Sequence, residues 1–218
     1  TISQSELDSK LALAKSAYKN WKNTSFQYRA ELFEKIAQLL ETRADEYAQL
    51  ITFEMGKVLS EAKAEVLKST TICRYYAKNA ENILAPQIIE TENLNKILHQ
   101  PTGAVFAIMP WNFPFWQVLR YSSAALMAGN VTMLKHAPNV TGCSLAIEKL
   151  YLDAGFPEGV FQSLVVDIDV TEYIISNEIV QGITLTGSER AGSSVASLAG
   201  KHLKKSVMEL GGSDPVLV

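Results

Sequence analysis

The sequence lacks any apolar run long enough to cross a membrane, and it has no charged-then-apolar leader at its N-terminus. It also lacks an excess of positive charge: the formal net charge is −3 and no basic run occurs. These absences give no indication of nucleic acid or an anionic membrane as a partner. The 218 residues have the composition of an ordinary globular protein and suffice for one large domain or two small ones. We therefore expect a cytoplasmic protein.

Cysteine and histidine are scarce. The two cysteines, Cys73 and Cys143, do not form a CxxC pair, and only three histidines are available to join them in a metal site. Such sparse usage also argues against a disulfide. Both cysteines lie in apolar helical patterns, so we interpret them as small buried hydrophobic residues and expect no metal.

The first third of the chain is predicted to be helical. A capping box joins Ser3 and Glu6, and Gly56 is a plausible helix stop. Apolar residues recur at helical spacing between these signals. The expected helices cover about residues 3–21, 31–56 and 60–84.

From about residue 93 the pattern changes to strands that alternate with helices, which predicts a parallel α/β sheet with helices on both faces. The segment LNKILHQPTG is expected to be extended and partly exposed. The chain begins with Thr1 rather than methionine and stops in DPVLV, which predicts a strand, so we expect a piece of a longer protein. The core strands are expected in GAVFAIM, NVTMLK, FQSLVV, VQGITLTG and KKSVMELGG.

Four of these strands end in segments that can carry chemistry. The segments are PWNFP, HAPN, GSERAG and GG. In open parallel sheets, ligands bind outside the carboxyl ends of the strands. The sequence therefore predicts a site where these ends meet.

The segment TGSERAG places Gly187 and Gly192 around the start of a helix that follows a strand. Free amides at a helix N-terminus can bind a phosphate, and Ser188 can cap the helix or contact a phosphate oxygen. The segment matches neither GxGxxG nor a P-loop, so an ordinary βα turn is the alternative. Lys135 ends another strand, where it can bind ribose hydroxyls or a phosphate, or be a solvated loop lysine.

Two further residues are candidates for catalysis. Glu209 lies among apolar residues, which would disfavour its charged form and suit a general base; the alternative is a strand-end carboxylate in water. In PWNFP, prolines fix the backbone and aromatics exclude water around Asn112. A rigid, dry amide donor can stabilise an oxyanion, whereas the alternative is an aromatic plug with a turn asparagine.

The order and spacing of these motifs resemble those of the aldehyde dehydrogenase superfamily. The motifs are PWNFP, the strand that ends at Lys135, TGS with its following glycine, and ELGG, and EMGK at residues 54–57 also fits. The resemblance covers essentially the whole chain. The variants KHAPN and ELGGSDP are most similar to bacterial succinate-semialdehyde dehydrogenases.

This resemblance implies a role for each motif residue. Asn112 would donate its amide to the thiohemiacetal oxyanion, and Glu209 would activate the water that hydrolyses the thioester. Arg120 matches an arginine that binds the substrate carboxylate, for which a guanidinium is suited; a surface helix arginine is the alternative. The implied cofactor-binding residues are Met109, Trp111, Lys135, Pro138, Gly187, Ser188, Gly192 and Leu210.

Three departures from the family pattern matter. The catalytic cysteine of the family lies beyond ELGG, so neither cysteine of this chain should be the nucleophile. Many relatives have Lys-Pro-x-Glu where this chain reads Lys135, His136, Ala137 and Pro138. The missing glutamate would repel a 2′-phosphate, so the cofactor is expected to be NAD or NADP. Tyr121 stands where many relatives carry a lysine beside the arginine.

The expected fold is thus a Rossmann-like α/β coenzyme-binding domain with an N-terminal helical layer. We expect helices over 1–84, an oligomerisation strand over 85–101 and the nucleotide-binding core over 102–218, without the catalytic cysteine domain. The expected activity of the intact protein, a dimer or tetramer, is NAD(P)-dependent oxidation of succinate semialdehyde to succinate. The alternatives are a nucleotide-binding module without turnover, or an enzyme for a neutral aldehyde.

Overall fold

The computed structural model describes residues 1–90, 95–213 and 215–216. The expected strand in DPVLV has Asp214, Leu217 and Val218 outside these residues. The helices are α1 (Gln4–Trp21), α2 (Phe26–Thr42), α3 (Ala44–Met55), α4 (Leu59–Ile83), α5 (Trp116–Met127), α6 (Thr141–Asp153), α7 (Thr171–Ser176) and α8 (Glu189–Lys201), with short 3-10 turns η1 (Pro138–Val140) and η2 (Ile168–Val170). The strands are β1 (Gln87–Ile89), β2 (Asn95–Ile97), β3 (Ala104–Met109), β4 (Val131–His136), β5 (Phe161–Ser163), β6 (Val180–Thr186) and β7 (Lys205–Glu209).

The centre of the molecule is a five-stranded parallel sheet with the order β5-β4-β3-β6-β7. The chain builds outward from β3 in one direction through β4 and β5, and then in the other direction through β6 and β7. This is the strand order of a Rossmann-type sheet, whose switch point lies between its first and fourth strands, here β3 and β6. The predicted fold class is confirmed.

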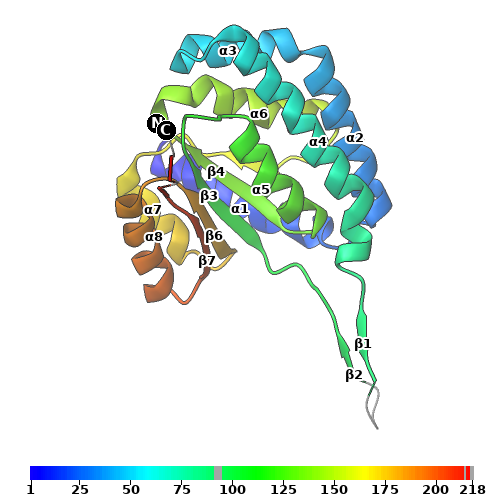
Figure 1. The fold of residues 1–218 in the computed structure, drawn as a ribbon. Helices are drawn as coiled ribbons and strands as arrows, with labels where there is room; N and C mark the ends of the chain where they lie inside the picture. The colour runs from blue at the N-terminus through cyan, green and yellow to red at the C-terminus, as the bar shows by residue number, and fades with distance from the viewer. Residues whose placement is uncertain (91–94, 214, 217–218) are drawn as a thin grey trace.

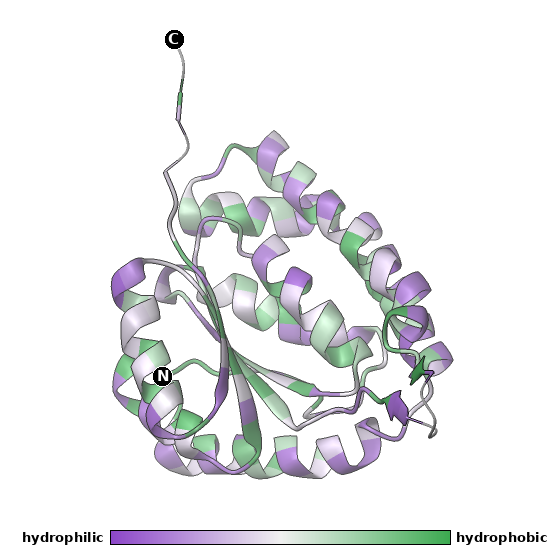
Figure 2. Ribbon diagram, turned by 60° about the horizontal axis from the view of Figure 1, so that its bottom comes forward, coloured by the Kyte–Doolittle hydropathy of each residue, from purple (hydrophilic) through white to green (hydrophobic). Residues whose placement is uncertain are grey.

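Helices cover both faces of this sheet (Figure 1). Helices α5 and α6 pack on one face, and α1, α7 and α8 pack on the other. Coloured by hydropathy, the helices carry both hydrophobic and hydrophilic residues, as expected of elements with one buried and one exposed face (Figure 2). Among the described residues, no helix combines the length and apolar character needed to span a membrane.

Helices α2, α3 and α4 form an additional layer outside α5 and α6 (Figure 1). This confirms the predicted N-terminal helical layer, with two differences. The expected helix over 31–56 is two helices, because the backbone of Arg43 leaves the helical region at φ −106° and ψ 17°. Its guanidinium lies 2.5 Å from the carboxylate of Asp153 on α6, so the break coincides with a tertiary contact. Helix α1 lies on the opposite side of the sheet from α2–α4.

Two local predictions in these helices are confirmed. The hydroxyl of Ser3 accepts a hydrogen bond from the amide of Glu6, and the Glu6 carboxylate accepts one from the amide of Ser3, which forms the capping box. Gly56 ends α3 in the left-handed conformation at φ 76°. Glycine adopts this conformation without a steric penalty, so it stops the helix.

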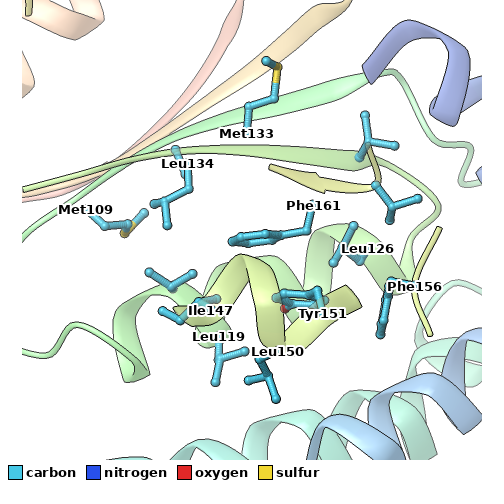
Figure 3. Close-up of a cluster of buried hydrophobic side chains, with 14 of the residues drawn as sticks. Met109, Leu119, Leu126, Met133, Leu134, Ile147, Leu150, Tyr151, Phe156 and Phe161 are labelled. Carbon is cyan, nitrogen blue, oxygen red and sulfur yellow. The ribbon is translucent and has the colours of Figure 1, made fainter. Parts of the chain in front are cut away.

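A cluster of buried apolar side chains lies between the sheet and helices α5 and α6 (Figure 3). Tyr151 stacks on Phe161 with ring centroids 4.3 Å apart, and Phe156 packs edge-on against Tyr151. Successive residues of β4 point to opposite faces, with Leu134 toward α5 and α6 and Met133 away from them. The core therefore fixes the orientation of β4, whose last residues belong to the candidate site.

The antiparallel pair β1 and β2 leaves the body of the protein as a narrow hairpin (Figure 1). Its base is fixed by the hydroxyl of Tyr18, which donates to the carbonyl of Pro101 at 2.8 Å. The exposed apolar side chains here include Ile88, Ile89 and Ile97. The oligomerisation strand expected over 85–101 stays a prediction, and its residues 91–94 lie outside the described part of the chain.

Candidate functional site

The carboxyl ends of the parallel strands meet at one edge of the sheet. Met109 at the end of β3 is in register with His136 at the end of β4, and Thr186 of β6 with Glu209 of β7. The segments that follow these strands are the four that the sequence singled out. Because β3 and β6 are neighbours, this edge is also the switch point where α/β sheets bind ligands.

A pocket of about 520 Å³ lies between this edge and helices α7 and α8. Lys135 is only 8% exposed there, and burial lowers the pKa of its ammonium, an effect that the nearby Asp167 carboxylate opposes. Arg190, on the first turn of α8, is exposed. The lining residues are Ile108, Lys135, Ile168, Asp169, Thr171, Leu185, Arg190, Ala191, Ser194, Val195 and Leu198. The pocket is thus largely apolar with a buried cation at one end.

The N-terminus of α8 opens toward the same edge. Ser188 is the N-cap, and its hydroxyl accepts a hydrogen bond from the amide of Ala191 at 3.3 Å. The amides of Glu189 and Arg190, at the first two helical positions, have no partner within the helix. The amide of Gly187 donates to the carbonyl of Glu209 at 3.0 Å, so it serves strand pairing rather than a ligand.

The remaining predicted cofactor residues lie around this edge in different environments. Met109 is buried in the core, and its carbonyl accepts from the amide of Ala137 at 3.0 Å. Pro138 begins η1 and is exposed, and Trp111 is half exposed. A Cβ built on Gly192 would lie 2.4 Å from the Leu210 side chain. Glycine at this position therefore lets the segment after β7 lie against the first turns of α8.

A second pocket of about 480 Å³ extends along the α5 face of the sheet, from the amino ends of β6 and β7 to Glu209 at the carboxyl end of β7. Arg120, Tyr121 and Glu209 are among its lining residues. The Arg120 guanidinium lies 3.9 Å from the Glu209 carboxylate. The predicted substrate and general-base residues are therefore together, on the face opposite the Lys135 pocket.

The surroundings of Glu209 differ from the sequence-based expectation. The sequence predicts a carboxylate among apolar groups, but the Glu209 side chain is 54% exposed. The physical reason is the position of β7 at the edge of the sheet, where it pairs only with β6 in the described part of the chain. In this structure, solvent and Arg120 rather than apolar side chains surround the carboxylate.

The segment that carries Asn112 also differs from the expectation. We define residues 110–115 as the Asn112 turn. Asn112 is exposed, and Trp111 and Phe113 are 49% and 42% exposed, so the aromatic side chains do not keep it dry here. Pro114 and Phe115 are buried, and Phe115 packs against Tyr47 with centroids 4.9 Å apart. Only the second half of the turn is therefore anchored by apolar packing.

Three polar side chains outside the motif support this turn. The Lys57 ammonium donates to the carbonyl of Asn112 at 2.7 Å, and it forms an ion pair with Glu65. His136 bonds the carbonyl of Pro114 at 3.0 Å. Sequence reasoning does not assign these roles, although EMGK and the histidine after Lys135 belong to the motifs it uses. The contacts join distant parts of the chain, so no local sequence pattern predicts them. The signal that the sequence does offer is the presence of a lysine and a histidine within these motifs.

The cysteines are buried, as predicted. Cys73 of α4 lies against Ser123 of α5, with its sulfur 3.7 Å from the hydroxyl oxygen. Burial raises the pKa of Cys73 to about 12. Burial and the neighbouring Glu54 carboxylate raise the pKa of Cys143 as well. Both thiols are therefore protonated and poorly nucleophilic at neutral pH.

The profile of the aldehyde dehydrogenase family matches residues 1–218. The chain belongs to the aldehyde dehydrogenase family. It is 48% identical over 217 residues to a probable succinate-semialdehyde dehydrogenase [NADP(+)] of Synechocystis, covering 99% of this chain and 48% of that protein. It is 42% identical to the Escherichia coli succinate semialdehyde dehydrogenase [NAD(P)+], covering 98% of this chain and 46% of the relative.

A solved aldehyde dehydrogenase structure has the same fold. The succinic semialdehyde dehydrogenase of Streptococcus pyogenes, in complex with NADP+, superposes with a TM-score of 0.96 at 36% identity. The match covers 98% of this chain and 48% of that one. The chain thus spans about half the length of the relatives it matches.

Proposed function

We propose that residues 1–218 form the coenzyme-binding part of an NAD(P)-dependent aldehyde dehydrogenase that oxidises succinate semialdehyde to succinate. The observation that carries the proposal is the apolar pocket at the switch point, with buried Lys135 on β4 and the free N-terminus of α8 beside it. The relatives named for this activity and these cofactors support it.

The residues at this edge fit a nicotinamide dinucleotide. The pocket of about 520 Å³ suits an adenosine, Lys135 can donate to ribose hydroxyls, and Ser188 with the first α8 amides can meet a phosphate. Pro138 presents no carboxylate against a 2′-phosphate, so NAD and NADP both fit. When bound, the nicotinamide supplies the acceptor for the hydride from the aldehyde carbon.

The chain's own residues divide the remaining work. Asn112 would donate its side-chain amide to the negative charge that develops on the aldehyde oxygen. Glu209 would take a proton from the water that releases the acid. Arg120 would bind the distal carboxylate of the substrate, and for this its contact with Glu209 must open. Binding of succinate semialdehyde to the Arg120 guanidinium would thereby also release the Glu209 carboxylate from its contact with Arg120.

A neutral aldehyde is the second candidate substrate. The observation in its favour is the 3.9 Å contact between Arg120 and Glu209, which provides the guanidinium with an anionic partner inside the chain. If this ion pair persists during turnover, the substrate needs no carboxylate.

We also propose a homo-oligomer, formed through the β1–β2 hairpin. Its two three-residue strands are exposed, and an isolated two-stranded hairpin is at best marginally stable in water. Apolar side chains such as Ile88 and Ile97 would be covered by a second subunit. Light scattering of the chain with Ile88→Asp and Ile97→Asp tests this: a dimer or tetramer should dissociate, and an unchanged mass would contradict the proposal.

Titration of the chain with NADPH, followed by its fluorescence, tests the nucleotide site. A charge-assisted hydrogen bond contributes about 1.5–3 kcal/mol, so Lys135→Met should weaken binding about 10- to 150-fold. The matched control is Lys149→Met, because this lysine is 71% exposed on α6. Equal affinities for Lys135→Met and the unsubstituted chain would refute the role of Lys135.

Steady-state kinetics of a longer protein that includes these residues distinguish the two substrates. Arg120→Leu should lower kcat/KM selectively for succinate semialdehyde, because only this substrate carries a carboxylate that the Arg120 guanidinium can bind. Loss of a bidentate pair, at about 1.5–3 kcal/mol, corresponds to about 10- to 150-fold. Equal losses for a neutral aldehyde of similar length would favour the second candidate.

A further inference from the structure

A buried ion pair lies behind the Asn112 turn. The Lys57 side chain, after α3, is 9% exposed, and the Glu65 side chain on α4 is 1% exposed. The ammonium forms an ion pair with Glu65, donates to the carbonyl of Asn112 at 2.7 Å and lies 3.8 Å from the centroid of the Phe113 ring. Lys57 therefore contacts both the backbone and a side chain of the turn.

The Glu65 carboxylate also anchors the end of the turn. Its Oε1 accepts hydrogen bonds from the amides of Phe115 at 2.9 Å and Trp116 at 3.1 Å, at the beginning of α5. Amides at a helix N-terminus have no partner within the helix, and the positive end of the helix dipole favours a carboxylate there. Glu65 thus joins Lys57, and through it Asn112, to a fixed helix.

The opposite side of the turn is bonded to β4. The Nδ1 atom of His136 lies 3.0 Å from the amide nitrogen of Ala137 and 3.3 Å from the carbonyl oxygen of Met109. Because a carbonyl oxygen can only accept, Nε2 carries a proton and donates it to the carbonyl of Pro114 at 3.0 Å. Burial lowers the pKa of His136, which favours the neutral form of the ring. The turn is consequently bonded to α4 on one side and to the central sheet on the other.

These contacts explain how an exposed turn can hold a defined shape. Trp111 and Phe113 are about half exposed, so packing alone does not fix Asn112. A buried ion pair is not an efficient way to gain stability, because apolar residues of similar volume often do as well or better. What the polar groups add is direction, because each bonds a particular backbone atom of the turn or of the helix that follows it.

We propose that Lys57, Glu65 and His136 are positioning residues that fix the Asn112 amide for its reaction. The inference rests on the proposed role of Asn112 as the oxyanion donor. None of the three needs to touch the substrate, since they act through the backbone of the Asn112 turn. An oxyanion donor is effective only if it is aimed before the charge develops.

The double variant Lys57→Met/Glu65→Gln tests this without leaving a buried charge alone. The side-chain carbonyl of the introduced glutamine can still accept from the α5 amides, whereas the carbonyl of Asn112 loses its donor. Nitrogen-15 relaxation of the 218-residue chain should show the backbone order parameter at residues 112–113 falling from about 0.85 to below about 0.6. The matched control is Lys63→Met. Lys63 lies on α4, as Glu65 does, and its substitution removes an exposed ion pair with Asp45, so the Asn112 turn should stay rigid.

His136 is tested by two substitutions in the same measurement. His136→Gln can place an amide donor near the carbonyl of Pro114, whereas His136→Leu fills similar space without a donor. The first should keep the order parameter of the turn near that of the unsubstituted chain, and the second should lower it. An unchanged turn in both His136→Leu and the double variant overturns the proposal.

A kinetic cycle in a longer, active protein separates positioning from general stability. Loss of a whole oxyanion donor lowers kcat about 10²- to 10³-fold, so a misdirected donor in Lys57→Met/Glu65→Gln should lower kcat about tenfold, with KM within about twofold. In an Asn112→Ala background, the substitutions Lys57→Met and Glu65→Gln should not lower kcat any further, because no Asn112 amide remains to be positioned. The same loss in both backgrounds overturns the inference. If Asn112→Ala leaves kcat unchanged, the proposed function of Asn112 fails instead, and the relaxation data still decide whether the turn is held.

Discussion

Arg29 is a buried guanidinium on α2 that bonds oxygens of the α1–α2 connection and of α5. It is 4% exposed and forms no salt bridge within the described residues. Its Nη1 donates to the carbonyl of Met127 at 2.8 Å and its Nη2 to that of Trp21 at 3.1 Å, both buried. Further bonds reach Thr24 and Lys22, where water has access. Arg29 therefore joins the N-terminal helical layer to a helix of the sheet domain.

Replacing Arg29 by leucine should destabilise the chain by about 1–3 kcal/mol, the cost of one unsatisfied buried polar group. The buried carbonyl of Met127 would lose its donor, whereas the carbonyl of Trp21 keeps the amide and the hydroxyl of Thr24 as donors. Loss of the guanidinium over Trp21, now 5.6 Å from the ring centroid, would add to this. Since a domain has about 5–15 kcal/mol of stability, the effect should be plain in equilibrium urea unfolding followed by circular dichroism.

Two controls make the measurement specific to Arg29. Arg29→Lys keeps the charge but offers a single ammonium, so it should lose less than the leucine variant. Arg190→Leu, at an exposed arginine, should stay within about 0.5 kcal/mol of the unsubstituted chain. A loss below about 1 kcal/mol in Arg29→Leu would refute the argument that the buried carbonyl of Met127 depends on this guanidinium.

Three further outcomes are expected of the chain. Burial raises the pKa of Cys73 to about 12 and also raises that of Cys143. As the pH rises, both thiols therefore ionise in the unfolded chain, near about pH 8.5, before they ionise in the folded chain. The free energy of unfolding should fall above that pH by up to about 1.4 kcal/mol per pH unit per thiol. Urea unfolding of Cys73→Ala/Cys143→Ala between about pH 8 and 9.5 should lack this decline, and parallel pH profiles would contradict it. Gly129→Ala should destabilise the chain by about 1–3 kcal/mol in the same assay, because Gly129 has a φ of +88° and an added Cβ would lie 2.9 Å from the Arg29 side chain. An unchanged free energy of unfolding in Gly129→Ala would disprove this backbone strain. The 218 residues are expected to bind NADPH without oxidising succinate semialdehyde, because both thiols are protonated; steady formation of NADPH from NADP+ would show this reasoning to be wrong.

The order of elements and the edge that carries the motifs were predictable from local pattern. Strands of apolar, β-branched residues alternate with amphipathic helices, and this alternation requires a parallel sheet. The carboxyl ends of such strands lie at one edge, so Lys135, Ser188 and Glu209 were expected there. The same reasoning did not find the break at Arg43, where helical periodicity continues through a change of direction.

The support of the Asn112 turn was not predictable in the same way. Glu65 and Phe115 are 50 residues apart in the sequence, and Lys57 and Asn112 are 55 apart. No local period relates such residues. Aromatic residues around Asn112 favour a dry enclosure when the sequence alone is considered, but exposure depends on what packs against them in space, and Trp111 and Phe113 remain half exposed.

The position of α1 has a consequence for the order in which the chain can fold. The carbonyl of Lys10 on α1 accepts from Gln162 of β5, 152 residues later in the sequence. During synthesis, the first helix is complete long before the sheet face that buries Leu7 and Leu11 exists. Its docking must await most of the chain, and such non-local contacts slow folding. We therefore expect α1 to be among the last elements protected in pulsed hydrogen exchange, although it precedes the whole sheet in the sequence.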